Sequence, residues 1–452
     1  MRTIFITCFT GLIGRNILST GAFRMLAERP DIRLVVLAPE SRAKILRQEY
    51  AAPNIIVETV ATPALGGRDK LIWVLATNLL PSGTRRVQRR AKLARDRNYL
   101  DFIASEVVGF LGRFRFVRRC FRWFADASGS YGEYDPLFER YRPDLLFATD
   151  VYAPYDVKLM RLARARGVKT VGMVRSWDNV TSKTLLMAIP DQLVVNTERI
   201  GQEVEHYGDV PPHIITAVGI PHYDRYRDER LRTPRREFFA KVRLRDSRKL
   251  ILFTPPSDRY LKSDPVPPVV LAALRDVPAN VLVRMPIVGR ADLGDYVPPP
   301  NALFDAPSNS PDFQEVHLSR AADQHLADSI FHSDLVITWA STMIIDAALF
   351  DKPVILVGFD VTPRSYGESI LQYYDYDHQR AILATGGARL VRSSAELKEW
   401  VMRYLADPSL DAAGRERLRR EFCGPLDGKS GERLGKYLLG SLKSNSKEQN
   451  AK

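Results

Sequence analysis

The stretch that decides the fold is "SDLVITWASTMIIDAALFDKPVILVGFD", residues 333–360. It begins with an apolar, strand-like run, "LVIT", which meets a turn of small residues at Ala340-Ser341-Thr342. A helical pattern starts immediately after the turn, and "KPVILV" is a second strand-like run. A strand, a helix and a second strand in this order predict a βαβ unit, and therefore a parallel sheet covered by helices on both faces.

The same alternation runs through both halves of the chain. A length of 452 residues exceeds one ordinary hydrophobic core, so we expect two domains. The predicted fold class is α/β, with two doubly wound, Rossmann-like domains whose strand ends face a central cleft. The expected boundaries are an N-terminal domain at 1–225 with a basic helical insertion at about 62–135, a linker at 226–245, a C-terminal domain with closing helices at 246–440, and a disordered tail at 441–452.

The composition is that of a soluble globular protein, with 45% hydrophobic and 26% charged residues. No run approaches the roughly 20 apolar residues of a membrane span. The start, "MRTIFITCFTGLIG", flows straight into strand and helix periodicity, so we interpret it as a first strand and not as a signal peptide. The cysteines Cys8, Cys120 and Cys423 are too far apart for a metal motif, which makes a reducing cytoplasm the simplest location.

The net charge of +13 is concentrated in one segment. Residues 84–122 hold twelve basic and three acidic side chains, and an aromatic stripe at helical spacing accompanies them. A basic amphipathic helix suits an anionic membrane surface, whereas a stripe that packs on the core is the alternative. We predict a cytoplasmic protein, peripheral on the inner face of the cytoplasmic membrane, and no nucleic-acid partner because no nucleic-acid module accompanies the charge. The expected membrane contacts are Phe114, Arg115, Arg118, Arg119, Phe121 and Arg122.

The turn at Ser341 and Thr342 is a candidate phosphate site, because free N–H groups at a helix start and two hydroxyls suit an anion. The alternative is a simple helix N-cap. Asp346, one turn further, can accept hydrogen bonds from the two hydroxyls of a ribose, or it is a partly exposed helical acid.

The motif "LVIT..ST..IDAALFDKPVILV" resembles the nucleotide-binding segment of GT-B glycosyltransferases, UDP-GlcNAc 2-epimerases and CDP-glycerol glycerophosphotransferases. The middle of the chain agrees, since "SWDNVTSK" and "VGIPHYD" occur in the order typical of bacterial surface-polysaccharide transferases of this superfamily. "DGKSGERLGKYL" is similar to the closing helix of the glycerophosphotransferase-like proteins. The resemblance implies GT-B architecture, a C-terminal domain that holds a UDP- or CDP-linked donor, and an N-terminal domain that holds the acceptor.

In that light, further residues become candidates for donor binding. Gly219 in "VGIPHYD" would let donor phosphates approach the backbone. Arg284 follows a strand and could neutralise a diphosphate, although Met285-Pro286 stands where relatives often have His-Pro. Glu368 and His378 lie in a tyrosine-rich stretch that suits a sugar or a base, and a plain aromatic loop is the alternative.

The catalytic candidates are Asp178 and His222. A carboxylate at a strand end can deprotonate an acceptor hydroxyl, and a histidine with a pKa near 6.5 can do the same or bind phosphate. The alternatives are that Asp178 caps a turn, that Trp177 belongs to the core, and that His222 packs on Tyr223. The expected acceptor-binding residues are Gly11, Gly14, Arg175, Trp177, Asn179 and Lys183, with a ligand-free tight turn as the alternative for the two glycines.

These observations predict a glycosyltransferase that moves a sugar from a nucleotide-activated donor to a surface-polysaccharide or lipid-linked glycan. We expect neither a cofactor nor a metal, because no DxD-like pair stands at a strand end. The first alternative is a glycerophosphotransferase that uses a CDP-linked polyol, with His222 and His378 as the important pair. The second is a catalytically silent scaffold on the membrane.

Overall fold

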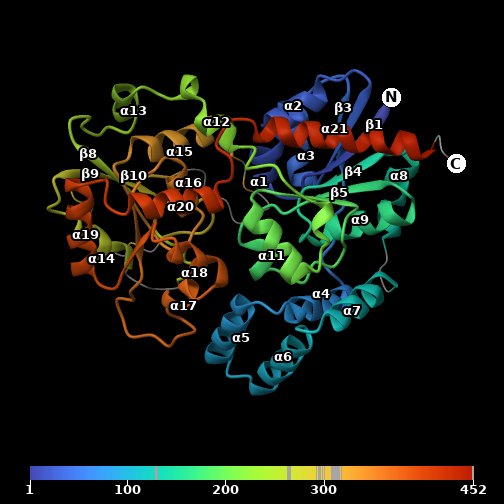
Figure 1. The fold of residues 1–452 in the computed structure, drawn as a ribbon. Coiled ribbons are helices and arrows are strands. Elements are labelled where there is room, and N and C mark those ends of the chain that lie inside the picture. The colour runs from blue at the N-terminus through green and yellow to red at the C-terminus, as the bar shows by residue number, and fades with distance from the viewer. Residues whose placement is uncertain are drawn as a thin grey trace. The chain divides into compact units, whose positions relative to one another are not determined.

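The computed structural model describes residues 1–127, 131–261, 266–291, 293, 297, 299, 301–306, 316 and 318–449, with side chains described as far as 442. Contacts divide the chain into two units. Unit 1 comprises Met1–Arg86, Leu100–Arg227 and Gly424–Lys452, and unit 2 comprises Val87–Tyr99 and Asp228–Cys423. Both units are α/β domains built on a parallel sheet, as the sequence predicts (Figure 1).

The sheet of unit 1 has the strand order β3-β2-β1-β4-β5-β6-β7. In chain order these strands are β1 (Arg2–Thr7), β2 (Ile32–Ala38), β3 (Ile55–Thr59), β4 (Leu145–Ala148), β5 (Lys169–Met173), β6 (Gln192–Val195) and β7 (Ile215–Ala217). The expectation that the chain opens with a strand is confirmed by β1. Strand order reverses between β1 and β4, and such a switch point is where α/β sheets bind ligands.

Helices cover both faces of this sheet, because side chains alternate along each strand. Ile4 and Ile6 of β1 belong to a buried cluster with Leu434 and Leu438, whereas Phe5 meets Phe138 on the other face at a ring distance of 5.2 Å. The helices that flank the sheet are α1 (Gly11–Ile13), the π-helical turn Gly14–Leu18, α2 (Gly21–Ala27), α3 (Glu40–Glu49), α8 (Asp135–Tyr141), α9 (Pro154–Ala165), α10 (Asn179–Ser182), α11 (Glu198–Gly208), α12 (Tyr223–Arg227) and α21 (Ser430–Gln449).

The insertion is helical, as expected. It forms α4 (Gly67–Leu79), α5 (Gly83–Asp96), α6 (Tyr99–Leu111) and α7 (Arg115–Ala127), followed by the short 3-10 turn Gly132–Tyr134. The division between the units falls inside α5, so Val87–Tyr99 belongs to unit 2, although we expected the whole insertion in the N-terminal domain.

The sheet of unit 2 has the strand order β10-β9-β8-β11-β12-β13. These strands are β8 (Lys249–Phe253), β9 (Ala279–Arg284), β10 (Ala302–Asp305), β11 (Leu335–Thr338), β12 (Val354–Val357) and β13 (Arg389–Val391). Its helices are the 3-10 turn Glu229–Leu231, α13 (Arg235–Lys241), α14 (Val266–Ala273), α15 (Arg320–His332), α16 (Met343–Leu349), α17 (Leu371–Tyr374), α18 (Asp377–Ala384), α19 (Ser394–Ala406) and α20 (Ala412–Phe422). The switch point lies between β8 and β11, and the quoted stretch forms the predicted β11-α16-β12 unit.

The end of the chain differs from the expectation. The last helix, α21, belongs to unit 1 and packs beside α2, although we assigned the closing helices to the C-terminal domain (Figure 1). It also continues to Gln449, and Ser441 and Leu442 are buried, so the predicted disordered tail from 441 is wrong over that range; 450–452 lie outside the described residues. The apolar stripe of α21 packs on one face of the sheet, and this packing explains why the segment is helical and not disordered.

Candidate active site

The switch point of unit 2 carries three hydroxyl groups in a row. Thr254 follows β8 and Thr338 ends β11, and their Oγ1 atoms lie 2.6 Å apart. The Oγ1 of Thr338 lies 3.0 Å from the Oγ of Ser341, which stands at the turn before α16. Thr342 occupies the N-cap position, but its exposed side chain forms no capping hydrogen bond. The alternative that the Thr342 side chain simply caps the helix is therefore wrong.

Aromatic rings lie beside these hydroxyls. Trp339 directly follows β11, and its ring lies 4.8 Å from that of Tyr260 and 5.5 Å from that of Tyr373. Edge-to-face contacts continue from Tyr373 to Tyr376 and from Tyr376 to His378, with ring centroids 5.5 and 5.6 Å apart. Of these residues our site prediction included only His378. Trp339 was detectable, because a tryptophan at a strand end beside a polar turn is the signal that we used at Trp177.

Asp346 is buried on α16, with 8% of its surface exposed. Burial raises the pKa of the Cys423 thiol at the end of α20, and the charge of Asp346 raises it further. The alternative of a partly exposed helical acid is wrong. Ribose binding by Asp346 stays a prediction.

Arg284 already has a partner in unit 2. Its Nη1 donates to Asp305 at 2.7 Å, and the Nε2 of His325 lies 3.0 Å from the same carboxylate oxygen. Burial opposes ionisation of Asp305, but the hydrogen bond from His325 and the charge of Arg284 hold its pKa below the usual value. The predicted phosphate contact of Arg284 would have to compete with this ion pair. Glu368 is exposed and accepts from Ser365, and its role stays a prediction.

The switch point of unit 1 also begins with a threonine pair. The Oγ1 atoms of Thr7 and Thr149 lie 3.1 Å apart, and Thr7 donates to the Oδ1 of Asp156 at 2.5 Å. Asp156 lies in the first turn of α9 and is 1% exposed. Burial, and then the nearby charge of Asp150, raise the pKa of Asp156 to about 8. A carboxyl group of the chain itself therefore fills this switch point.

The "SWDN" segment follows β5, but its members have different surroundings. Arg175 forms an ion pair of 2.7 Å with Asp150, so its charge is already balanced by the protein. Trp177 is buried, with 9% of its surface exposed, as the core alternative has it. Asp178 occupies the N-cap position of α10, where its carboxylate accepts hydrogen bonds from the hydroxyls of Ser176 and Ser182 and makes no side-chain capping bond to a backbone N–H. Lys183 is exposed.

Several polar atoms near the carboxyl edge of unit 1 have no hydrogen-bond partner among the described residues. They are buried and follow four different strands: the Oγ1 of Thr10, the side-chain amide of Asn179, the Oδ1 of Asn196 and the Nδ1 of His222. Buried polar groups are normally satisfied, so unpaired groups near a sheet edge are a reason to expect a ligand there. Sequence reasoning missed Thr10 and Asn196.

His222 combines packing with an unpaired nitrogen. Its ring meets those of Tyr223 and Tyr226 at 4.6 and 5.8 Å, as the packing alternative requires. Burial, and then the charge of Arg15, hold its pKa well below the usual value. The imidazole is therefore neutral near pH 7, and the same surroundings make it a weaker base than a free histidine.

The expected role of Gly219 is not supported by its surroundings. It has φ +90°, and a Cβ there would lie 2.3 Å from the Oγ of Ser430. The group that approaches its backbone is therefore the start of α21 and not a phosphate. Asp224 holds the same turn by accepting from the N–H groups of Ser430 and Gly431. Gly11 and Gly14 are helical, and Gly14 has φ −50°, so the alternative of a ligand-free tight turn is wrong, and acceptor binding by these glycines stays a prediction.

The predicted membrane helix, α7, is partly a structural clamp. Arg118 and Arg122 are buried and form ion pairs with Asp209, which follows α11. The Nη2 of Arg122 also donates to the carbonyl of Gly208 at 2.6 Å. These arginines and the buried Phe121 cannot contact a membrane, because their charges and ring are used inside unit 1. Phe114, Arg115 and Arg119 remain exposed, and Arg115 also reaches Asp209 at 3.1 Å.

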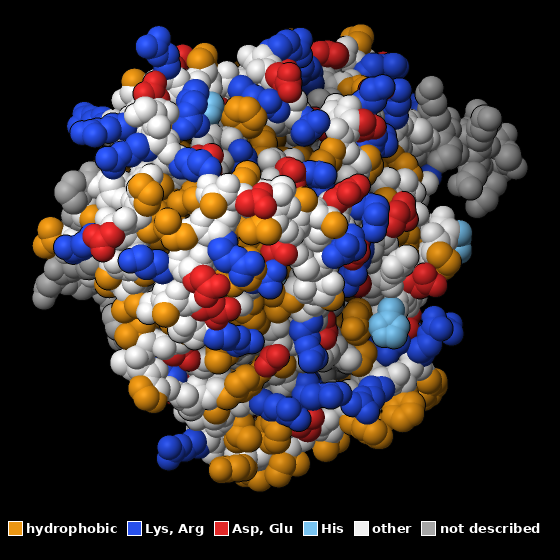
Figure 2. Space-filling model, turned by 60° about the vertical axis from the view of Figure 1, so that its left-hand side comes forward, with side chains coloured by type: hydrophobic (Ala, Val, Ile, Leu, Met, Phe, Trp, Pro, Cys, Tyr) orange, Lys and Arg blue, Asp and Glu red, His pale blue; other side chains and the backbone are white. Residues whose placement is uncertain are grey.

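The exposed part of the insertion is strongly apolar. Figure 2 shows hydrophobic side chains gathered along the lower edge of the molecule, with arginine and lysine side chains beside them. The large exposed apolar residues of α6, α7 and the turn between them are Tyr99, Leu100, Ile103, Val107, Phe110, Leu111, Phe114, Phe116, Trp123 and Phe124. No helix in the described part of the chain is long and apolar enough to cross a membrane. Among the same residues, no group of three His, Cys, Asp or Glu side chains is suited to hold a metal ion.

Comparison with solved structures identifies proteins of the same fold. UDP-GlcNAc 2-epimerase from Neisseria meningitidis, solved with bound UDP-GlcNAc, superposes with a TM-score of 0.56 at 11% identity, covering 97% of this chain and 100% of that one. The calicheamicin glycosyltransferase CalG4 gives 0.53 at 12% identity, with 98% of each chain covered. A variant of the wall teichoic acid polymerase TagF gives 0.51 at 10% identity, covering 99% of this chain and 90% of that one.

At the level of sequence, residues 308–440 match the family model of CDP-glycerol:poly(glycerophosphate) glycerophosphotransferase. No curated protein sequence matches the chain significantly. The matched segment contains the turn at Ser341, the buried Asp346 and the aromatic residues of α17 and α18. The chain therefore has the two-domain GT-B fold, and its residues 308–440 are similar to the glycerophosphotransferases, in agreement with the resemblance that the sequence motifs indicate.

Proposed function

We propose that the protein is a glycosyltransferase that moves a sugar from a nucleotide-activated donor to a hydroxyl of a surface-polysaccharide or lipid-linked glycan. The observation that carries this proposal is the switch point of unit 2, where the hydroxyls of Thr338 and Ser341 lie 3.0 Å apart and Trp339, between them in sequence, packs its ring against Tyr260. Hydroxyl donors suit a diphosphate, and an aromatic face suits a base or a sugar. The likeness to an epimerase solved with UDP-GlcNAc supports a nucleotide-sugar donor.

The proposed reaction needs one proton acceptor and no redox partner. The acceptor oxygen forms a bond to the anomeric carbon, the bond from that carbon to the phosphate oxygen breaks, and the nucleoside diphosphate leaves. The proton of the acceptor hydroxyl goes to a base in unit 1. We propose His222 for this role because its Nδ1 is unpaired among the described residues and the ring is neutral. Asp178 is the second candidate, since it is a carboxylate that directly follows the carboxyl end of β5.

A second candidate reaction is the transfer of a polyol phosphate from a CDP-linked donor. The match of residues 308–440 to a glycerophosphotransferase model favours it. In this reaction the acceptor oxygen attacks phosphorus and CMP leaves. The site in unit 2 would serve equally well, so the nucleotide and the donor distinguish the two reactions.

We propose further that the exposed surface of α6 and α7 holds the protein at an anionic membrane, where a lipid-linked acceptor resides. Phe116 and Trp123 are each 75% exposed, and Arg113, Arg115 and Arg119 lie beside them. Exposed apolar rings next to basic groups are the features of interfacial helices. Sedimentation with vesicles of anionic lipid tests this point. Phe116→Ser with Trp123→Ser should reduce binding, and vesicles of neutral lipid should bind less.

The first experiment is a thermal-shift screen of the full chain against UDP, CDP, GDP and ADP. A ligand that binds only the folded state at 100 times its Kd adds about 2.7 kcal/mol of stability. A shift with UDP, followed by transfer from a UDP-sugar, supports the first reaction, and a shift with CDP and transfer of a polyol phosphate supports the second. If none of the four nucleotides raises the Tm, the proposal of a nucleotide-dependent transferase fails and a membrane scaffold becomes the better explanation.

A further inference from the structure

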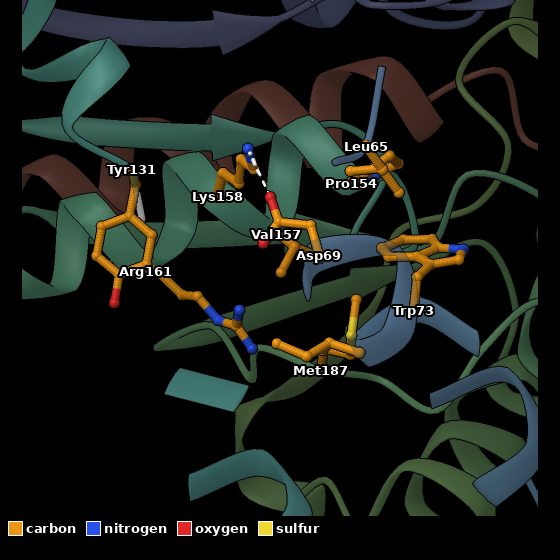
Figure 3. A pocket seen from close by; sticks show the side chains of 10 residues that line it. Leu65, Asp69, Trp73, Tyr131, Pro154, Val157, Lys158, Arg161 and Met187 are labelled. Atoms are coloured by element: carbon orange, nitrogen blue, oxygen red, sulfur yellow. Dashed lines mark ion pairs between the residues drawn. The ribbon is translucent and has the colours of Figure 1, made fainter. Parts of the chain in front are cut away.

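The helical insertion divides between the two units. Its first helix, α4, is tied to α9 of unit 1 by an ion pair in which the Nζ of Lys158 lies 3.1 Å from the carboxylate of Asp69 (Figure 3). Its last helix, α7, is held in the same unit by the ion pair of Arg118 with Asp209. The second half of α5, Val87–Tyr99 with the residues that follow the helix, belongs instead to unit 2. This half-helix is therefore part of the unit that contains the proposed nucleotide site.

A glycine marks the contact between α5 and the rest of unit 2. Gly367 is buried, although its neighbours Tyr366 and Glu368 are exposed. A Cβ atom at Gly367 would lie 2.6 Å from the carbonyl oxygen of Ala91 and 2.8 Å from the Cβ of Ala94. The helix approaches the backbone at Gly367 so closely that only glycine fits, and a larger residue would push α5 away.

Gly367 is linked in turn to α17, the helix that carries Tyr373. The side-chain amide of Gln372 donates to the carbonyl of Gly367 at 2.8 Å and to that of Ser369 at 3.2 Å. Gln372 is buried and directly precedes Tyr373, whose ring lies edge-to-face against Trp339 with centroids 5.5 Å apart. A displacement of Gly367 is therefore passed to the residue next to Tyr373.

The charges of α5 reach the same segment. Burial raises the pKa of Tyr373, and the positive charge of Arg95 on α5 opposes this rise. Burial likewise raises the pKa of Tyr366, and the charge of Arg90 opposes it. Charges near the surface act over about 10 Å at physiological ionic strength, so both arginines lie close to the tyrosines. The electrostatics thus agree with the close contact at Gly367.

We propose that the second half of α5 is a positioning element of the donor site, which holds α17 through Gly367 and Gln372 so that Tyr373 packs against Trp339. The inference rests on the proposed function, because it assigns these two rings to the base or the sugar of the donor. The residues of α5 act through the rings and do not touch the donor. They lie outside the segment 308–440, so the insertion adds to the donor site a part that the family resemblance does not include.

The test is calorimetric titration of the full chain with the four nucleotides of the thermal-shift screen and with pyrophosphate. Gly367→Ala forces α5 from its position and should weaken binding of the nucleotide about tenfold, the effect expected when one contact between a base and an aromatic ring is lost. The affinity for pyrophosphate should not change, because pyrophosphate lacks the base and the sugar.

Gly387→Ala is the matched control in the same unit. Gly387 is buried in the turn before β13, and a Cβ there would lie 2.7 Å from the carbonyl oxygen of Gly414 on α20. The steric conflict is of the same kind, but it involves neither α5 nor α17. This variant should lose stability and keep the wild-type affinity for nucleotide and for pyrophosphate.

If Gly367→Ala fails to fold, Gln372→Met replaces it, because this change removes the hydrogen bonds to Gly367 and Ser369 and keeps a long, unbranched side chain. Wild-type nucleotide affinity in the variant that folds overturns the proposal. An equal loss of affinity for nucleotide and pyrophosphate, or the same loss in Gly387→Ala, also overturns it, since a general disturbance of unit 2 produces either result. If the wild type binds none of the nucleotides, the proposed function fails and this inference fails with it. If the wild type binds one and the variants match it, this inference alone fails.

Discussion

The two switch points of this protein start from the same pair of side chains and end differently. Each has two threonines on neighbouring strands, at 3.1 Å in unit 1 and 2.6 Å in unit 2. In unit 1 the pair is covered by the buried carboxyl group of Asp156. In unit 2 the third partner is the half-buried hydroxyl of Ser341, at a turn whose next residue is exposed.

The difference teaches that a ligand-binding topology does not guarantee a free binding edge. The rule that α/β sheets bind ligands at a switch point concerns the backbone. Whether a ligand fits depends on which side chains arrive there. In unit 1 the chain supplies its own acid and the ion pair of Arg175 with Asp150, whereas in unit 2 it supplies hydroxyls and aromatic rings.

The largest expected effect is a pH dependence that belongs to unit 1. The folded pKa of Asp156 is about 8, above its usual value of about 3.9, so the folded state binds more protons than the unfolded state between these values. The free energy of unfolding should therefore fall as the pH rises through this window, by up to about 1.4 kcal/mol per pH unit. Asp156→Asn stays neutral and should flatten the slope in urea unfolding curves recorded from about pH 5 to 8.

The control for this slope is Asp31→Asn. Asp31 is a half-exposed acid of the same unit, and its hydrogen bond with Arg29 lowers its pKa, so it titrates below the window. This control should keep the wild-type slope. If Asp156→Asn also keeps the wild-type slope, the proton on Asp156 does not contribute to the stability of unit 1, and the contrast with unit 2 fails.

A second prediction concerns Gly219, which the start of α21 approaches closely. Gly219→Ala should lower the free energy of unfolding by roughly 2–3 kcal/mol, because φ is +90° and the new Cβ meets Ser430. Chemical denaturation measures the loss. Gly21→Ala in α2 is the matched change, since a Cβ there meets nothing within 4 Å, and its effect should be neutral or slightly stabilising. Equal effects of the two substitutions would mean that the return of α21 does not depend on this close approach.

The smallest expected effect concerns the hydroxyl groups of the two switch points. Ser341→Ala should weaken binding of the nucleotide by about tenfold, since a hydrogen bond to a charged group is worth roughly 1.5–3 kcal/mol. Thr149→Val makes the comparable change at the other switch point and should leave nucleotide affinity unchanged. Calorimetric titration measures both variants. A loss of affinity in Thr149→Val and none in Ser341→Ala would reverse the assignment of the two domains.

Local pattern predicted much of the fold and part of the site. The strands, the polar turn and the helix of residues 333–360 are neighbours in sequence, so their pattern predicts their arrangement. The burial of Arg118 and Arg122 was not predictable in this way. Their partner, Asp209, lies 91 residues from Arg118, and a count of charges does not show which of them meet. Trp339 was predictable, and we overlooked it because the hydroxyl residues beside it explained the turn.

The sequence by itself determined that the chain is α/β, with parallel sheets, a helical basic insertion and a polar turn at a strand end. Hydrophobic periodicity and turn residues act over a few positions, and a sequence displays them directly. Only the tertiary structure decided which polar groups the protein uses internally. Asp156, Gly219 and Arg118 contact residues that are distant in sequence. Such contacts depend on distances in space, as burial and charge pairing do.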